Sequence, residues 1–246
     1  MNNQKVTFKE RLIVFSYHLT FSVLLLLVSM ILIFYIWYPG ALKYATGVLT
    51  VYTMLLVIDL ILGPVLTALV YKKHRIKFIF DMSIILIIQL SAFIFGLYTL
   101  EKGRPAWLVF VIDDFEIVAK SDLAANTAVP EQFKINFWEK PKWVAAVYSD
   151  DPNIRQKQQE DEIFNGISLT TRPDSYKEIE VKRQSILNKS KLVDELGQYN
   201  TLSAQEVDNL QGYNRWLPLK APKVDMVVLI EKSGRPTKIV NLRPWE

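Results

Sequence analysis

The chain has no cysteine and only two histidines among its 246 residues. Without cysteine it cannot form a disulfide bond, a thiol nucleophile or a thiolate metal site. Both histidines, His18 and His74, precede residue 104, so the rest of the chain excludes a Ser–His–Asp centre, a Cys–His centre and an ordinary zinc site. A glycine-rich phosphate loop is also absent. We therefore predict that the protein is not an enzyme and has no catalytic residue, no bound cofactor and no metal ion.

Long apolar runs are absent after Thr99 and dominate the sequence before it. Three runs, at about residues 17–37, 46–71 and 78–100, approach the ~20 residues that a helix needs to cross a bilayer. The first could instead be a cleaved signal peptide, but its apolar core exceeds the ~7–15 residues typical of such a segment. Trp37-Tyr38-Pro39, which follows it, is typical of an interfacial aromatic anchor. We predict three retained transmembrane helices within residues 1–103.

Basic residues flank these runs asymmetrically. The N-terminal segment carries Lys5, Lys9 and Arg11, and the loop at 72–77 is strongly basic, whereas the loop between the first two runs carries only Lys43. Because positively charged loops stay on the cytoplasmic side, the N-terminus is predicted to be cytoplasmic and the C-terminal domain periplasmic in a bacterial inner membrane. These topology signals account for the net charge of +4, and we expect no nucleic-acid partner.

The second run has a carboxylate near its middle, Asp59, followed by Gly63-Pro64. An ionisable residue at this depth is costly and usually faces a partner or a cavity. Gln89 and Ser29 fall at similar depths in the other two runs, so we expect one polar layer in which Gln89 donates to the Asp59 carboxylate. Pro64 lacks a backbone donor and should bend or loosen the helix.

Three roles are open for Asp59: it could pin the helices together, contact a partner helix, or lie on a proton or ion path. Gly63 allows another backbone to approach closely, and Thr67 can satisfy backbone groups that Pro64 leaves free. Together with Pro64 and Gln89, these residues are the candidate partner-binding set.

The cytoplasmic end of the third run offers a second polar feature. Lys77 and Asp81 have the i,i+4 spacing of an ion pair and are interpreted as an interfacial charge pair. His18 and His74 are interpreted as interfacial or loop residues.

Residues 104–246 are predicted to form a soluble α+β domain with a small antiparallel sheet. Asp113-Asp114 and Ser233-Gly234 are expected as hairpin turns, because aspartate and glycine favour turns. Ser203 and Glu206 form a capping box that predicts a short helix ending near Gly212. The expected strands are 107–112, 115–119, 143–148, 225–230 and 237–242, and the other expected helices are 153–165 and 174–196.

Aromatic residues are frequent in the first half of this domain. They could form an exposed platform, but packing into the core is the favoured interpretation. The set consists of Trp107, Phe133, Phe137, Trp138 and Trp143.

Several short motifs occur between residues 17 and 118. They are Trp37-Tyr38-Pro39, Asp59-x-x-Leu62-Gly63-Pro64-x-Leu66-Thr67, Lys77-Phe78-x-Phe80-Asp81 with Gln89, Gly96-x-Tyr98, Arg104-Pro105, and Val109-Phe110-x-x-Asp113-Asp114-Phe115-Glu116. In these motifs the chain resembles the TfpX/TfpZ-type type IV pilin accessory proteins. The resemblance covers roughly residues 17–118 and is only architectural beyond them.

This resemblance implies a non-enzymatic inner-membrane factor, a chaperone or stabiliser, for one cognate type IV major pilin. Such a protein, embedded in the lipid bilayer, could touch both the membrane helix of the pilin and its periplasmic head. The alternative is a small subunit of an ion or solute transporter that uses Asp59. A sensor is disfavoured because the predicted cytoplasmic segments are too short to form an output domain.

Overall fold

The computed structural model describes residues 7–71, 76–125 and 127–245. Within this part of the chain, three helical segments are long and apolar enough to cross a membrane. They are Phe8–Trp37, Val48–Val70 and Ile79–Lys102. The chain divides into two compact units, one of Met1–Ile33 with Val48–Glu101 and the other of Phe34–Gly47 with Lys102–Glu246.

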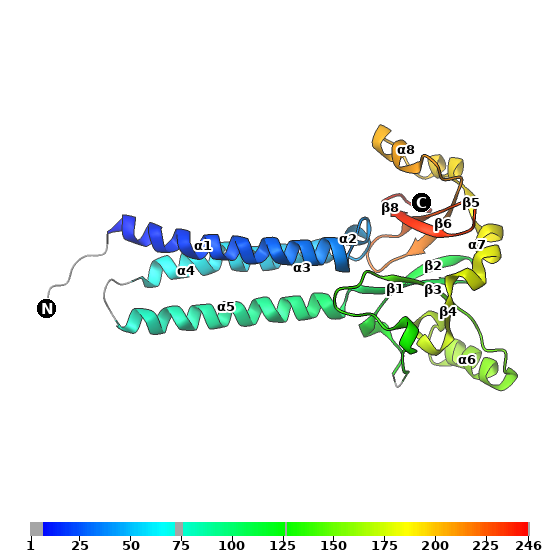
Figure 1. Ribbon diagram of the computed structural model, residues 1–246, viewed down its shortest axis with the longest axis horizontal. Coiled ribbons are helices and arrows are strands. Elements are labelled where there is room, and N and C mark those ends of the chain that lie inside the picture. The colour runs from blue at the N-terminus through cyan, green and yellow to red at the C-terminus, as the bar shows by residue number, and fades with distance from the viewer. Residues whose placement is uncertain (1–6, 72–75, 126, 246) are drawn as a thin grey trace. The chain divides into compact units, whose positions relative to one another are not determined.

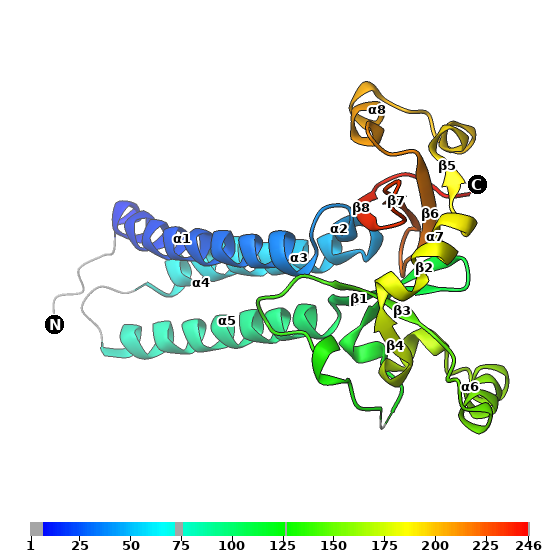
Figure 2. The same ribbon diagram turned by 45° about the vertical axis from the view of Figure 1, so that its right-hand side comes forward.

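The first unit consists of the apolar helices, which run alongside one another (Figures 1 and 2). The first helix begins with a capping box in which Thr7 and Glu10 satisfy each other's backbone N–H groups. It starts nine residues before residue 17, so the helix is longer at this end than the apolar run in the sequence. The helices are α1 (Phe8–Ile31), continued by the π-helical η1 (Leu32–Trp37); α3 (Val48–Val57), the π-helical η2 (Ile58–Leu62) and α4 (Gly63–Val70); and α5 (Ile76–Lys102). The last four residues of η1, from Phe34 on, already belong to the second unit.

The predicted loosening at Gly63-Pro64 takes the form of the π-helical segment η2. Pro64 has no N–H to donate, so one carbonyl of the preceding turn loses its usual partner. The hydrogen-bond ladder widens immediately before it, where the N–H of Gly63 donates to the carbonyl of Ile58. Asp59 lies within this wider turn, and such π segments are frequent at functional sites.

The second unit contains the strands, which pair in one eight-stranded sheet in the described part of the chain. The strands are β1 (Pro105–Val111), β2 (Asp114–Ala119), β3 (Lys142–Ala146), β4 (Tyr176–Glu178), β5 (Lys191–Leu192), β6 (Arg215–Lys220), β7 (Met226–Ile230) and β8 (Pro236–Val240). Its α-helices are α2 (Leu42–Ala45), α6 (Pro152–Phe164), α7 (Arg183–Lys189) and α8 (Ala204–Leu210).

The sheet is mixed, and the expectation of an antiparallel sheet was wrong. Its order is β4-β3-β1-β2-β6-β7-β8, with β5 also paired to β6. The two predicted hairpins, β1–β2 and β7–β8, are present and antiparallel. The pairs β1–β3 and β2–β6 are parallel. Parallel neighbours need a long crossover rather than a tight turn, and the long segments after β2 provide these connections.

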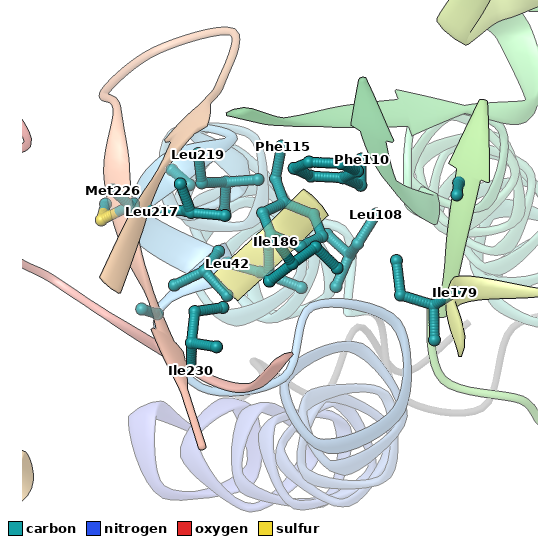
Figure 3. Packing of buried hydrophobic residues seen from close by; sticks show 14 residues of the cluster. Leu42, Leu108, Phe110, Phe115, Ile179, Ile186, Leu217, Leu219, Met226 and Ile230 are labelled. Carbon is teal, nitrogen blue, oxygen red and sulfur yellow. The ribbon is translucent and has the colours of Figure 1, made fainter. Parts of the chain in front are cut away.

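One core of the second unit lies on a single face of this sheet (Figure 3). Alternation along β7 sends Val228 and Ile230 into this core and Val227 and Leu229 into another on the opposite face. Leu42 of α2 and Ile186 of α7 complete the first core, and both are almost fully buried.

The segment Phe34–Gly47 therefore belongs to the second unit, although it lies between two spans in the sequence. Ala41 and Ala45 join Leu42 in the core. The carbonyl of Ala45 accepts hydrogen bonds from the N–H groups of Lys223 and Val224, at 3.0 and 3.2 Å. The loop after the first span is thus part of the folded sheet unit.

The predicted long helix 174–196 is wrong. Tyr176–Glu178 pairs with β3 as an edge strand, and Lys191–Leu192 pairs with β6, so sheet pairing overrides the helical pattern. Only Arg183–Lys189 is α-helical, and its neighbours form short 3₁₀ turns. The helices predicted at 153–165 and after Ser203 are present as α6 and α8.

Candidate functional site

A cluster of polar side chains lies inside the first unit. All but Gln89 are almost completely buried, with exposed fractions of 5% or less. Every long helical segment contributes, so polar groups from distant parts of the sequence meet in an otherwise apolar bundle. The cluster consists of His18 and Ser22 of α1, Asp59 of η2, Thr67 of α4 and Gln89 of α5.

His18 is the centre of this polar cluster. Its Nδ1 lies 2.6 Å from the Thr67 hydroxyl, and its Nε2 lies 2.8 Å from Oε1 of Gln89. An amide oxygen can only accept, so Nε2 carries a proton and donates to Gln89. In the neutral imidazole the Thr67 hydroxyl then donates to Nδ1. His18 thereby ties α1 to both α4 and α5.

The Gln89 amide continues the network. Its Nε2 lies 3.4 Å from the Ser22 hydroxyl and 3.3 Å from the backbone carbonyl of Asp59, and it donates to both. Gly63 makes room for this amide, because a Cβ at position 63 would lie 2.4 Å from Oε1 of Gln89. The predicted close approach at Gly63 is therefore made by a side chain of α5.

Asp59 is the exception within the cluster. The residue is 2% exposed, and neither of its buried carboxylate oxygens has a hydrogen-bond partner among the described residues. Gln89 donates to the backbone of Asp59, so the expected bond from Gln89 to the carboxylate was wrong. The carboxylate lines a small pocket with room for about one water molecule. The other lining residues are His18, Phe21, Ser22 and Leu25 of α1 and Leu86, Gln89, Leu90 and Phe93 of α5.

Ser29 does not join this polar layer. Its hydroxyl donates to the carbonyl of Leu26 at 2.9 Å and lies 3.3 Å from the Tyr52 hydroxyl. The depth estimate failed because α1 begins at Phe8, which moves the middle of the helix toward His18. Each residue adds about 1.5 Å along a helix, so Ser29 lies about three turns from His18.

The candidate residues of the second span are brought together, but inside the unit. Gly63, Pro64 and Thr67 are buried, and Thr67 has no exposed surface. Thr67 and Gln89 contact the His18 ring, Asp59 and Gln89 line the pocket beside it, and Gly63 lies against the Gln89 amide. The contacts that join the helices are made by His18, Thr67 and Gln89 and not by the Asp59 carboxylate. The three roles considered for Asp59, and partner binding by the whole set, stay predictions.

The predicted charge pair is only half described. Asp81 lies in α5, whereas the Lys77 side chain lies outside the described residues, as does His74. The pair therefore stays a prediction.

His18 and Ser22 were missed as site residues. Together with Ser29 they lie four and then seven residues apart, which places them on one face of α1. A polar stripe of this kind on an apolar helix marks a buried face. That spacing was visible in the sequence.

A second polar group bridges β2 and β6 in the other unit. Lys220 Nζ lies 2.5 Å from Oδ2 of Asp114, and the Thr170 hydroxyl donates to Glu116 at 2.7 Å. Burial raises the pKa of Asp114 although Lys220 opposes this, and the hydrogen bond to Asp114 raises the pKa of Lys220. Because the Asp114–Lys220 pair connects the adjacent parallel strands β2 and β6, and Thr170 connects a neighbouring 3₁₀ turn to β2, we interpret the group as a structural bridge.

The aromatic set divides between core and surface. Trp107 and Phe133 are 1% and 2% exposed, and Trp143 is partly buried, as the core interpretation predicts. Phe137 and Trp138 are 43% and 70% exposed, so the core interpretation is wrong for this pair.

No protein-family model and no solved structure matches the chain. Curated proteins of Dichelobacter nodosus do match. The chain is 26% identical to "Fimbrial assembly protein, serogroup E1" over 100% of both chains. It is 33% identical to the serogroup I protein over 53% of this chain and 52% of that one. The protein of serogroups C1 and C2 is 34% identical over 50% of this chain and 94% of its own length. With this coverage, the chain belongs to the family of these fimbrial assembly proteins.

Proposed function

We propose that this protein assists fimbrial assembly from within a membrane, as a chaperone or stabiliser of a cognate type IV pilin. The observation that carries the proposal is the match to a fimbrial assembly protein along the whole chain, through the helical unit as well as the sheet unit. The motif resemblance to TfpX/TfpZ-type accessory proteins supports the same role. In this proposal the membrane is the bacterial inner membrane, the C-terminal unit is periplasmic and no reaction is catalysed.

The pocket beside Asp59 is the proposed contact for the pilin helix. Its lining residues come from α1 and α5, and Phe21 and Leu90 are 51% and 39% exposed. Only 6% of the apolar window of α5 is buried within the chain, compared with 22% for the first span and 28% for the second. A helix lying along α5 would cover this surface, and a donor on that helix would satisfy the Asp59 carboxylate.

This arrangement fits the way helices associate in lipid. Lipid tails are as apolar as leucine, so association depends on close packing and on polar contacts rather than on a hydrophobic drive. Most polar groups of the cluster already have partners within the chain. The Asp59 carboxylate lacks one among the described residues, and it is the group that a partner would engage.

Site-specific photocrosslinking in cells that express the cognate pilin tests the proposal. A crosslinking residue at Leu90 should capture the pilin, whereas one at Ile79, an exposed residue of α5 outside the pocket, should capture less. Asp59→Leu should abolish the Leu90 crosslink and lower pilin abundance, and Asp81→Leu is the matched control. Equal crosslinking at both positions that survives Asp59→Leu would contradict helix binding at this pocket.

The transporter alternative rests on the same unpaired carboxylate. It requires that purified protein in liposomes moves an ion or solute and that Asp59→Asn stops the flux. Pilin-dependent crosslinking without any such flux would favour the assembly role.

A further inference from the structure

Two adjacent aromatic side chains are exposed on the surface of the second unit. Phe137 and Trp138 lie edge to face, with ring centroids 4.9 Å apart. Trp138 is 70% exposed, whereas Trp107 and Trp216 of the same unit are 1% exposed or less. Two adjacent aromatic rings left in water lose the benefit of burying large apolar surfaces. The two adjacent rings thus leave apolar surface that the core of this unit does not cover.

The segment that carries them is held rigidly by Trp37. The indole Nε1 of Trp37 donates to the carbonyl of Phe137 at 2.9 Å, and the two rings meet edge to face at 5.0 Å. Trp37 itself has no exposed surface. The position of the aromatic pair is thus fixed to that of Trp37.

Arg104 holds the same segment from a second point. Its side chain is fully buried and donates to the carbonyls of Glu139 and Asn136, at 2.9 and 2.7 Å. The guanidinium also stacks 5.6 Å from the ring centroid of Trp37. The two anchors and the aromatic segment therefore form one packed group within the second unit.

The positions of Trp37 and Arg104 in the sequence fix how deep both lie relative to a membrane. Trp37 is the last residue of the candidate span Phe8–Trp37, and Arg104 follows the last residue of the span Ile79–Lys102 by two positions. Trp37 is itself the end of its candidate span, and the Cα atom of Arg104 lies within about 8 Å of the end of the other, since consecutive Cα atoms are about 3.8 Å apart. A segment bound to both of them lies at the level of the lipid headgroups.

We propose that Phe137 and Trp138 insert into the headgroup region of the leaflet in which these two spans end. Tryptophan is enriched at this depth because its ring is apolar while its N–H can still be solvated. The exposed Lys140 next to the pair supplies a cation at the level of the lipid phosphates. The aromatic pair is then a further attachment of the second unit to the bilayer, additional to its chain connections.

The absence of cysteine from the chain allows a direct test. The full-length variants Trp138→Cys, Phe164→Cys and Ile94→Cys are spin-labelled and reconstituted in liposomes without any partner. Phe164 is a 78% exposed aromatic at the end of α6, and Ile94 is a 63% exposed residue within the span of α5. Relaxation by oxygen, which partitions into lipid, is compared with relaxation by a water-soluble nickel chelate.

We expect the ratio of oxygen to nickel accessibility at position 138 to exceed that at position 164 several-fold and to approach that at position 94. A ratio at 138 equal to that at 164 would place the pair in water and overturn the proposal. Protection of position 138 from both reagents would show burial against protein and would also overturn it.

Discussion

His18 shows how one side chain connects three helices. Both of its ring nitrogens have hydrogen-bond partners, Thr67 on α4 and Gln89 on α5, so α1 is held to each neighbour by a polar contact in an apolar surrounding. A polar side chain in the bilayer is costly unless it finds such partners. Asp59 departs from this pattern, because its buried carboxylate has no partner among the described residues. Added binding energy is therefore available to a donor that reaches it.

Replacing Thr67 by valine should destabilise the helical unit. Valine has a similar shape but no hydroxyl, so Nδ1 of His18 loses its partner, and we expect a loss of about 0.6–1.7 kcal/mol. Thermal unfolding of the full chain in detergent measures the change. Thr53→Val is the matched control, because the Thr53 hydroxyl is exposed and bonds only its own helix at Leu49. A melting temperature that falls equally in both variants would show that the His18 contact adds no stability.

Tyr148 should make the second unit sensitive to alkali. Burial raises the pKa of Tyr148 to about 12, and the hydrogen bond to Glu162 and its charge act in the same direction. The unfolded tyrosine has a pKa of about 10, so between these values the unfolded state binds fewer protons and stability falls as the pH rises.

The comparison of Tyr148→Phe with the wild type isolates this effect. Between pH 9 and pH 11 the melting temperature of the wild type should fall further than that of Tyr148→Phe. The exposed Tyr44 gives the control variant Tyr44→Phe, which should follow the wild type. An identical fall in the melting temperature of all three proteins would show that the titration of Tyr148 does not cause the loss of stability.

At the scale of elements, α2 is small but central to the core of the second unit. Leu42 is 1% exposed and packs with residues of several strands (Figure 3). Truncating it leaves a cavity, so Leu42→Ala should cost about 2–5 kcal/mol. The neighbouring Tyr44 is 44% exposed, and Tyr44→Ala should cost far less although it removes more atoms. Chemical denaturation, followed by the fluorescence of the sheet unit, measures the free energy of unfolding of both variants. Equal losses in the two variants would contradict the central place of Leu42 in the core.

The success of the sequence analysis differs between elements for physical reasons. The three long apolar helical segments were predictable because all backbone hydrogen bonds of a helix form within its own segment. The hairpins β1–β2 and β7–β8 were predictable from local alternation and turn residues. The structure of the segment 174–196 was not predictable, because two parts of it pair with strands that are distant in the sequence. Strand β6 was missed, since Pro218 within it argues against a strand interior.

The polar cluster was predictable only in part. Asp59, Thr67 and Gln89 stand out because polar groups in apolar runs are costly. His18 was assigned to the interface because the start of α1 was placed too late, and its depth was therefore misjudged. Which atom Gln89 would contact depends on the π-helical turn η2 and on the space at Gly63. Neither can be derived from composition.

At the scale of the whole molecule, the second unit is assembled from two separate stretches of chain. Phe34–Gly47 and Lys102–Glu246 pack together, and two apolar helical segments lie between them in the sequence. The core of this unit cannot be completed until both stretches have come together.

A fragment of residues 102–246 should therefore be incomplete without the segment 34–47. Alone, it lacks Ala41, Leu42 and Ala45 in its core and leaves the N–H groups of Lys223 and Val224 without the carbonyl of Ala45. We expect it to be cleaved rapidly by a protease and to become resistant when a synthetic peptide of residues 34–47 is added. The same peptide with Leu42→Ala should protect much less, because it cannot fill the core. Equal resistance with and without the peptide would mean that the sheet folds independently of this segment, and the packing of Leu42 would then be a consequence of the fold rather than a requirement for it.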